Sequence, residues 1–341
     1  MSNEVNSSLL DISLLPYEIG IPRVVRFWII LIFYIPSLIC SLFVLYYFIA
    51  SRTLRQALHN HVITLLLIVN FIVQLTSIPW IINYYRLEGQ VSPQSPSFCI
   101  VWILIDEGLT ITITALFAWA TVERHILIFH DQLVATRRKI LIFHYLPIVV
   151  VLLYCFFYSL IVIIIPPCEN VFDYTQLVCG YPLCYYDQQA LAIWDIVFDH
   201  LIPIIIIISC SLGLLLRILY QKSHMRQPTR WRNYRKMTIQ LLSISFLYLI
   251  IYIPHMFMEF LHLCCIPEEV GADFKAYSQF FLYYGNLLLP VVCAGSMPEL
   301  QSKLKKLFVC CKRQARAVQP ETIALSRRAG DRHLKNIATA Q

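Results

Sequence analysis

The stretch of sequence that decides the fold is residues 99–125, CIVWILIDEGLTITITALFAWATVERH. It begins at a cysteine, ends in a Glu-Arg-His triplet, and carries only two charged side chains in between. The 25 residues from Cys99 to Arg124 extend for roughly 37 Å as an α-helix. The hydrocarbon core of a bilayer is about 30 Å thick. We therefore predict a membrane-spanning helix whose two ends lie in different compartments.

Six further apolar runs of similar length indicate an all-α membrane protein. Of the 341 residues, 58% are hydrophobic and only 14% are charged, whereas about 25% of a soluble domain is charged. So few charges do not cover a water-exposed surface, and we expect apolar side chains to face lipid. We predict a bundle of seven membrane-spanning helices, at residues 27–50, 61–85, 98–124, 140–165, 191–219, 238–263 and 277–297.

Lysine and arginine are concentrated on one side of the predicted bundle. The connecting segments and tail of that side hold 23 of the 27 basic residues, and the other side holds only Arg23, Arg26, Arg86 and Lys275. Cytoplasmic loops carry the excess of Lys and Arg in membrane proteins. We therefore expect a plasma-membrane protein with its amino terminus outside the cell and its carboxyl terminus in the cytoplasm.

The same pattern divides the chain into an extracellular segment (1–26), a membrane domain (27–297) and a cytoplasmic tail (298–341). The first segment shows no cleavable signal peptide, so we expect the first span to act as an uncleaved anchor. It also contains the sequon Asn6-Ser7-Ser8, which predicts glycosylation at Asn6.

The spacing between Cys99 and the triplet Glu123-Arg124-His125 resembles the rhodopsin-like (class A) family of G-protein-coupled receptors. In that family a cysteine begins the third helix, and an Asp/Glu-Arg-Tyr triplet ends it at this distance. The resemblance covers about residues 27–311. The prolines of the last three spans also match the family's helix pivots, at Pro203, Pro254 and Pro290.

The resemblance implies a receptor that transmits the binding of an extracellular ligand to a heterotrimeric G protein. Glu123, Arg124 and His125 are then the G-protein switch, in which Arg124 leaves Glu123 on activation. The basic amphipathic stretch 298–309 resembles the family's short eighth helix along the membrane. Membrane lipids are expected partners of that helix, and the adjacent Cys310 and Cys311 resemble its palmitoylation site.

The family also has a disulfide between the start of the third helix and the following external loop. Here Cys99 is one partner, and either Cys179 or Cys184 fits by its distance to Pro203, with Cys184 slightly preferred. The chain departs from the family at Asn70, where an Asp is usual, and at Cys293, where a Tyr is usual. The family's internal sodium site and its water-mediated latch are therefore not carried over.

Acidic residues in the outer halves of several spans predict a cationic ligand, either an amine or a short basic peptide. Asp106 lies about two turns inward from Cys99, and in amine receptors of the family an Asp there pairs with the ammonium of the ligand. Tyr283 matches the aromatic that neighbours that Asp. The expected ligand-binding residues are Asp106, Glu107, Asp195, Asp199, His255, Glu259 and Tyr283. The same acids also fit a solvated external rim without a ligand role.

Two other functions remain open: a seven-span transporter or channel, and a scaffold receptor that no longer signals. A transporter needs a polar path through the whole membrane, but the acids cluster in the outer half of the spans. No nucleophile–base pair or metalloprotease motif is present, so we expect no enzymatic activity. We also expect no cofactor, no bound metal and no nucleic-acid partner.

Overall fold

The computed structural model describes residues 19–303 apart from 167, 181–182, 225–227, 265, 268 and 298–299. Met1–Ser296 form one compact unit and Met297–Gln341 a second, of which residues 297 and 300–303 are described. The predicted glycosylation site Asn6, the palmitoylation sites Cys310 and Cys311, and most of the eighth helix lie outside the described residues. They remain predictions.

The first unit is built from helices, and no strand occurs among its described residues. Its α-helices are α2 (Arg23–Ala50), α3 (Arg52–Gln56), α4 (Leu58–Leu75), α5 (Ser77–Arg86), α6 (Pro96–Phe129), α7 (Arg137–Ile140), α8 (Leu146–Ser159), α9 (Gln189–Trp194), α10 (Ile202–His224), α11 (Pro228–Cys264) and α12 (Ala272–Ser296). Three π-helical turns continue these helices, at η2 (Leu141–Tyr145), η3 (Leu160–Ile164) and η6 (Asp195–Leu201). Three 3₁₀ turns lie in connections, at η1 (Asp131–Val134), η4 (Leu177–Cys179) and η5 (Cys184–Asp187).

These helices form the predicted seven-helix bundle. Six stretches are long and apolar enough to cross a membrane: Arg23–Ala50, Asn60–Arg86, Pro96–Phe129, Arg137–Ile164, Gln189–Arg217 and Thr238–Cys264. Helix α12 is the seventh, and its hydropathy is lowered by polar residues such as Gln279 and Asn286. The observed helices extend beyond the predicted spans, most clearly at the start of α11. Hydropathy reports only the apolar part of a helix, whereas backbone hydrogen bonding continues into the water.

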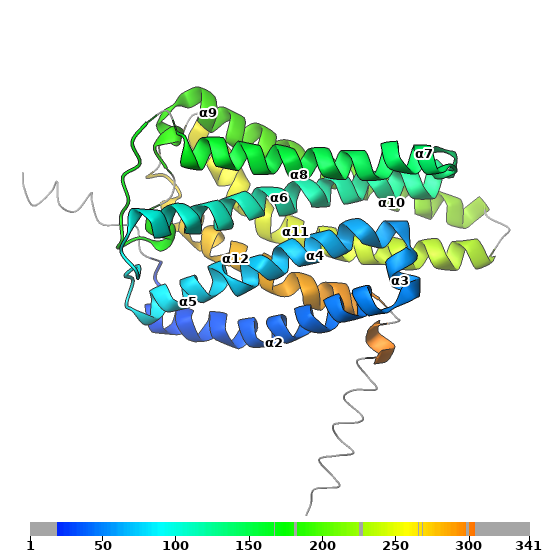
Figure 1. Cartoon of the computed structure of the whole chain (residues 1–341), viewed down its shortest axis with the longest axis horizontal. Helices are drawn as coiled ribbons and strands as arrows, with labels where there is room; N and C mark the ends of the chain where they lie inside the picture. Colours follow the sequence, from blue (N-terminus) through cyan, green and yellow to red (C-terminus); the bar gives the residue numbers. More distant parts are fainter. Residues whose placement is uncertain are drawn as a thin grey trace, which may run out of the picture. The chain divides into compact units, whose positions relative to one another are not determined.

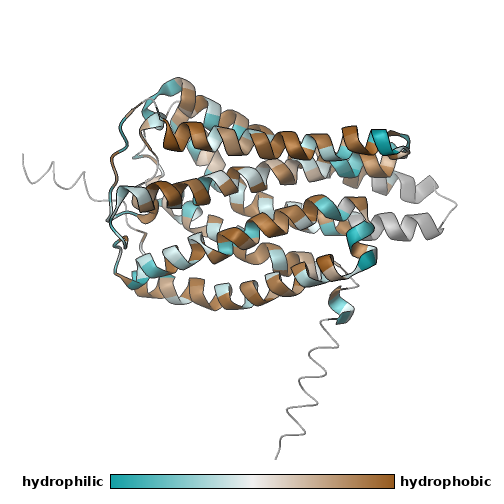
Figure 2. Ribbon diagram, in the orientation of Figure 1, coloured by the Kyte–Doolittle hydropathy of each residue, from teal (hydrophilic) through white to brown (hydrophobic). Residues whose placement is uncertain are grey.

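The long helices run side by side (Figure 1), and α12 packs against both α11 and α2. Helix α6 lies at the centre and contacts α4, α8, α10 and α11. Hydrophobic residues run along most of the bundle, and hydrophilic ones gather at helix ends and loops (Figure 2). Large apolar side chains on the outer faces, such as Ile32, Phe156 and Phe246, are exposed, as expected for a surface covered by lipid.

Helix α12 is held to its neighbours at a proline. Because Pro290 has no N–H, the carbonyl of Asn286 four residues earlier lacks its helical donor. The side-chain amides of Asn70 (3.0 Å) and Gln74 (2.9 Å), both on α4, donate to this carbonyl. The neutral side chain of Asn70 therefore helps to hold α12 against α4.

Candidate functional site

A cavity of about 440 Å³ lies between α6, α11 and α12, at the end of the bundle that carries the long loop 166–188. We call this the loop end, and the opposite end, which carries Glu123–His125, the triplet end. The loop contributes Val178 and Tyr186 to the wall of the cavity. Small-molecule sites are typically clefts of about 300–1,000 Å³. The cavity is therefore large enough for a small molecule or a side chain of a peptide.

Five of the seven residues that the sequence marked for ligand binding line this cavity. They come from three helices that are far apart in the sequence, and they are Asp106, Glu107, His255, Glu259 and Tyr283. The remaining two, Asp195 and Asp199, are not among the described residues that line it.

Asp195 and Asp199 lie instead against α8, where tyrosine hydroxyls bind them. Asp195 accepts hydrogen bonds from Tyr158 (2.8 Å) and from Tyr186 of the long loop (2.6 Å). Asp199 accepts one from Tyr154 (2.7 Å). Both carboxyls are almost fully buried, so these tyrosines supply the donors that buried acids require.

Both acids lie in the π turn η6. They share one face, as their spacing of four residues predicts, but that face meets α8, whereas Ile196 and His200 of the same turn line the cavity. Spacing indicates which residues share a face, and only contacts in the folded bundle show which neighbour that face meets.

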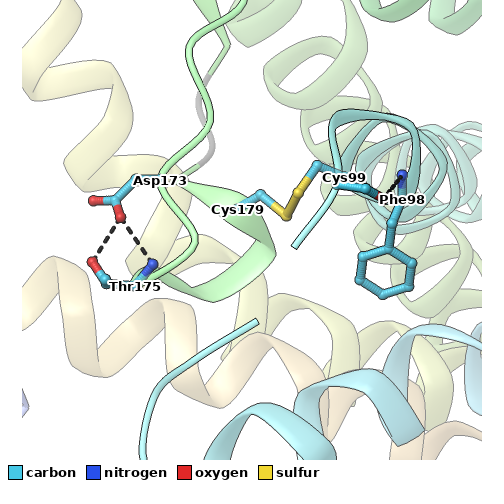
Figure 3. Close-up of a disulfide and its surroundings, with 6 residues drawn as sticks. Phe98, Cys99, Asp173, Thr175 and Cys179 are labelled. Atoms are coloured by element: carbon cyan, nitrogen blue, oxygen red, sulfur yellow. Dashed lines mark hydrogen bonds between the residues drawn. A yellow bond between two sulfur atoms is a disulfide. The ribbon is translucent and has the colours of Figure 1, made fainter. Parts of the chain in front are cut away.

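Two disulfides hold the long loop (Figure 3 shows the first). Cys99 at the start of α6 pairs with Cys179, and Cys168 pairs with Cys184. The preference for Cys184 as the partner of Cys99 was therefore wrong, and the alternative is correct. The chain has positive φ at Val178 (53°) and Cys179 (57°), which turns Cys179 towards α6. Sequence spacing does not report such a turn.

A tight turn precedes this disulfide in the loop. The carboxylate of Asp173 accepts hydrogen bonds from the backbone amide (2.9 Å) and the hydroxyl (2.6 Å) of Thr175 (Figure 3). It also accepts one from the side-chain amide of Gln176 (2.9 Å). These donors stabilise the charged form and lower the pKa of Asp173 below its ordinary value. The Tyr84 hydroxyl donates to the carbonyl of Thr175 (3.0 Å), so the turn is tied to α5.

At the triplet end, Glu123 is bound by a chain of histidines. The carboxyl of Glu123 is hydrogen-bonded to Nδ1 of His144 in η2. Nε2 of His144 lies 3.2 Å from Nδ1 of His61 in α4, and Nε2 of His61 lies 2.9 Å from the carbonyl oxygen of Arg55. Glu123 and His144 are both buried.

The other two triplet residues also lie inside the bundle. Arg124 is 1% exposed. His125 donates from Nε2 to the carbonyl of Cys210 in α10 (2.6 Å). The triplet therefore joins α6 to helices on two sides.

A model of the rhodopsin family of seven-transmembrane receptors matches residues 40–292. The chain belongs to this family. No curated protein sequence matches the chain significantly. Members of the family are multi-pass receptors of the plasma membrane that signal through G proteins and are not enzymes. The rhodopsin-family assignment accords with the bundle, the Cys99 disulfide and the buried triplet.

In this receptor Asp106 has a structural partner. The hydroxyl of Ser77, at the start of α5, donates to the carboxylate of Asp106. The indole of Trp102 donates in turn to that hydroxyl (3.3 Å). Asp106 is 7% exposed. It therefore links α6 to α5 as well as lining the cavity.

The outer part of the receptor cavity holds an ion pair that the sequence analysis did not identify. Nζ of Lys275 on α12 lies 3.0 Å from Glu259 on α11. His255 lies 3.6 Å from the same carboxylate and 3.3 Å from the hydroxyl of Ser278. Lys275 is one of only four basic residues that the sequence analysis assigns to the outside. Its rarity there was the feature from which an acidic partner could have been predicted.

A stack of tyrosines leads from the cavity into the bundle. Tyr252 lines the cavity and stacks on Tyr248, with ring centroids 4.0 Å apart. The Tyr248 hydroxyl is hydrogen-bonded to Thr114 on α6. Gly285 on α12 allows the close approach, since a Cβ there would lie 3.2 Å from the Tyr252 ring.

Proposed function

We propose that the receptor binds an extracellular cationic ligand in the cavity and transmits this binding to a heterotrimeric G protein. The observation that carries the proposal is the charge of the cavity wall. Four carboxyl groups line it, from Asp106, Glu107, Asp187 and Glu259, against one lysine, Lys275. An excess of one charge in a cleft raises the local concentration of ligands with the opposite charge.

The proposal includes the orientation of the receptor. The loop end is outside the cell and the triplet end is in the cytoplasm. The distribution of Lys and Arg supports this orientation, because the triplet end and its loops carry most of them. Two disulfides at the loop end also support it, since disulfides persist in oxidising compartments.

The route of transmission runs through the tyrosine stack. A ligand that contacts Tyr252 presses on Tyr248, and the bond of Tyr248 to Thr114 couples α11 to α6. Farther along α6, Glu123 must leave His144 before Arg124 becomes available to a G protein. The pivots Pro254 and Pro290 lie inside α11 and α12, and Pro203 follows η6 in α10.

The cavity floor supports a receptor over a channel. Below Tyr252 and Asn286 the next space is only about 20 Å³. Its wall includes the apolar side chains of Leu66, Ile113 and Phe117. A polar solute that enters from the loop end therefore meets a packed apolar layer.

Ligand-dependent nucleotide exchange tests the function. Membranes with the full-length receptor are mixed with purified G proteins of each class, and GTP analogue uptake is measured against a panel of amines and short basic peptides. We expect at least one cationic ligand to accelerate exchange, and Arg124→Ala to abolish that acceleration while ligand binding remains. Ligand-dependent current or uptake without nucleotide exchange contradicts the proposal.

A further inference from the structure

We propose that Glu107, rather than its neighbour Asp106, is the counter-ion of the ligand, and that the group it binds is a primary ammonium. The inference rests on the proposed function, because it specifies the cation that the receptor cavity accepts. Both carboxyls line the cavity, but their hydrogen-bonding environments differ.

The carboxyl of Asp106 already has a donor, the Ser77 hydroxyl, which Trp102 holds in place. Among the described residues, no hydrogen bond or ion pair reaches the carboxyl of Glu107, although its side chain is only partly exposed. An ionised group in such a site is costly unless a partner joins it. A ligand cation is the partner that an otherwise unpaired carboxylate on a cavity wall favours.

The other two acidic residues of the cavity wall are less available to a ligand cation. Glu259 is bound by Lys275 at 3.0 Å. Asp187, in η5 of the long loop, is exposed, so water competes for its carboxylate. A ligand cation that binds Glu259 must first displace an ammonium of this chain. Glu107 is therefore the acid that a ligand cation reaches with the least competition.

Three neutral polar groups with unused hydrogen-bonding capacity line the same cavity as Glu107. They are the Tyr252 and Tyr283 hydroxyls and the Asn286 side-chain amide, and none makes a hydrogen bond within the described part of the chain. All three side chains are more than nine-tenths buried.

This set of groups matches a primary ammonium. An ammonium has three N–H donors and no acceptor. One N–H pairs with the Glu107 carboxylate, and the others meet oxygens of Tyr252, Tyr283 or Asn286. A quaternary ammonium carries the same charge but donates no hydrogen bond, so it leaves these oxygens unsatisfied. The ammonium belongs either to a small amine or to a lysine side chain of a peptide.

Cysteine accessibility tests the counter-ion without a known ligand or a G protein. Thr110 lines the cavity three residues after Glu107, hence on the same helix face. Thr110→Cys is labelled in the full-length receptor with 2-aminoethyl, 2-trimethylammonioethyl or 2-sulfonatoethyl methanethiosulfonate. Peptide mass spectrometry distinguishes labelling at position 110 from labelling at native cysteines such as Cys264. The labelling rate of each reagent is divided by the rate at which that reagent reacts with a free thiol in solution.

We expect the aminoethyl reagent to react fastest and the sulfonate slowest. Glu107→Gln should lower the ratio of aminoethyl to sulfonate rates by about tenfold, the size of effect that one charge in a cleft produces. Glu107→Asp should keep the ratio, and Asp106→Asn should change it much less. A ratio that follows Asp106 and not Glu107 overturns the assignment, whether or not the receptor activates a G protein.

Protection experiments test the primary ammonium and its source. 2-Phenylethylamine and a lysine-containing tripeptide are compared with tetramethylammonium as inhibitors of Thr110→Cys labelling by the sulfonatoethyl reagent. Protection by either primary amine but not by tetramethylammonium supports the proposal, and the stronger of the two identifies the source. Equal protection by all three, or by none, overturns the requirement for N–H donors.

Discussion

The loop end and the triplet end of the receptor use their polar groups in opposite ways. At the triplet end, Glu123, His144 and His61 bind one another in an unbroken series, and His125 binds the backbone of α10. At the loop end, the side chains of Glu107, Tyr252, Tyr283 and Asn286 line the cavity without a hydrogen-bond partner among the described residues. These side chains are available to a ligand, as the proposed function requires, whereas those of the triplet end hold α6 to its neighbours.

The largest expected effect concerns the loop that covers the cavity. Cys179→Ser removes the buried bond to α6, and we expect a loss of about 2–4 kcal/mol in the stability of the loop end. Cys184→Ser removes a partly exposed bond within the loop and should cost less. Thermal unfolding of the purified receptor measures both variants. Equal losses of stability in the two variants would contradict the prediction that the Cys99–Cys179 bond contributes more than the Cys168–Cys184 bond.

The second prediction concerns the hydrogen-bonded side chains of the triplet end. His144→Leu removes the donor of buried Glu123, which should cost about 1–3 kcal/mol and raise ligand-independent nucleotide exchange. His130→Leu, on the same end but outside the network, is the control. Unchanged basal exchange in His144→Leu would remove the histidines from the switch.

Two tyrosine-to-phenylalanine variants compare a hydroxyl that makes a hydrogen bond with one that makes none in the described structure. Tyr158→Phe deprives buried Asp195 of a donor, and we expect a loss of about 1 kcal/mol. Tyr283→Phe removes a hydroxyl without a hydrogen-bond partner in the described structure, so stability should stay within about 0.5 kcal/mol, while ligand binding weakens. Thermal unfolding and ligand binding are measured for both. A larger stability loss for Tyr283→Phe contradicts the description of the cavity floor.

The smallest expected effect is the pH dependence of the Asp173 turn. Its hydrogen bonds lower the pKa of Asp173 below the ordinary 3.8. The stabilisation is therefore present above pH 3.8 and is lost as pH falls through the lowered pKa. Amide hydrogen exchange at Thr175 should speed up in that acidic range, and Asp173→Ala, which has no side-chain acceptor, should show fast exchange at every pH. Exchange at Thr175 that is independent of pH, after correction for the intrinsic rate, would exclude this role.

The sequence alone determined the parts of this receptor that depend on local composition. Apolar runs long enough for a bilayer gave seven helices, because a lipid-embedded backbone must satisfy its own hydrogen bonds and does so as a helix. The distance from Cys99 to Arg124 identified α6, since the rise of a helix per residue is constant. Five of the expected ligand residues also lie on the cavity wall, because their distance along each helix sets their depth in the bundle.

Contacts between helices depend on the folded bundle. Asp195 and Asp199 meet tyrosines of α8 rather than the cavity, and the path of the long loop selects Cys179 over Cys184. The pairs Glu123–His144 and Glu259–Lys275 join different helices. Periodicity gives the face of a single helix, whereas a partner depends on the packing, rotation and depth of two helices. Whether a polar side chain has a hydrogen-bond partner therefore depends on the folded bundle.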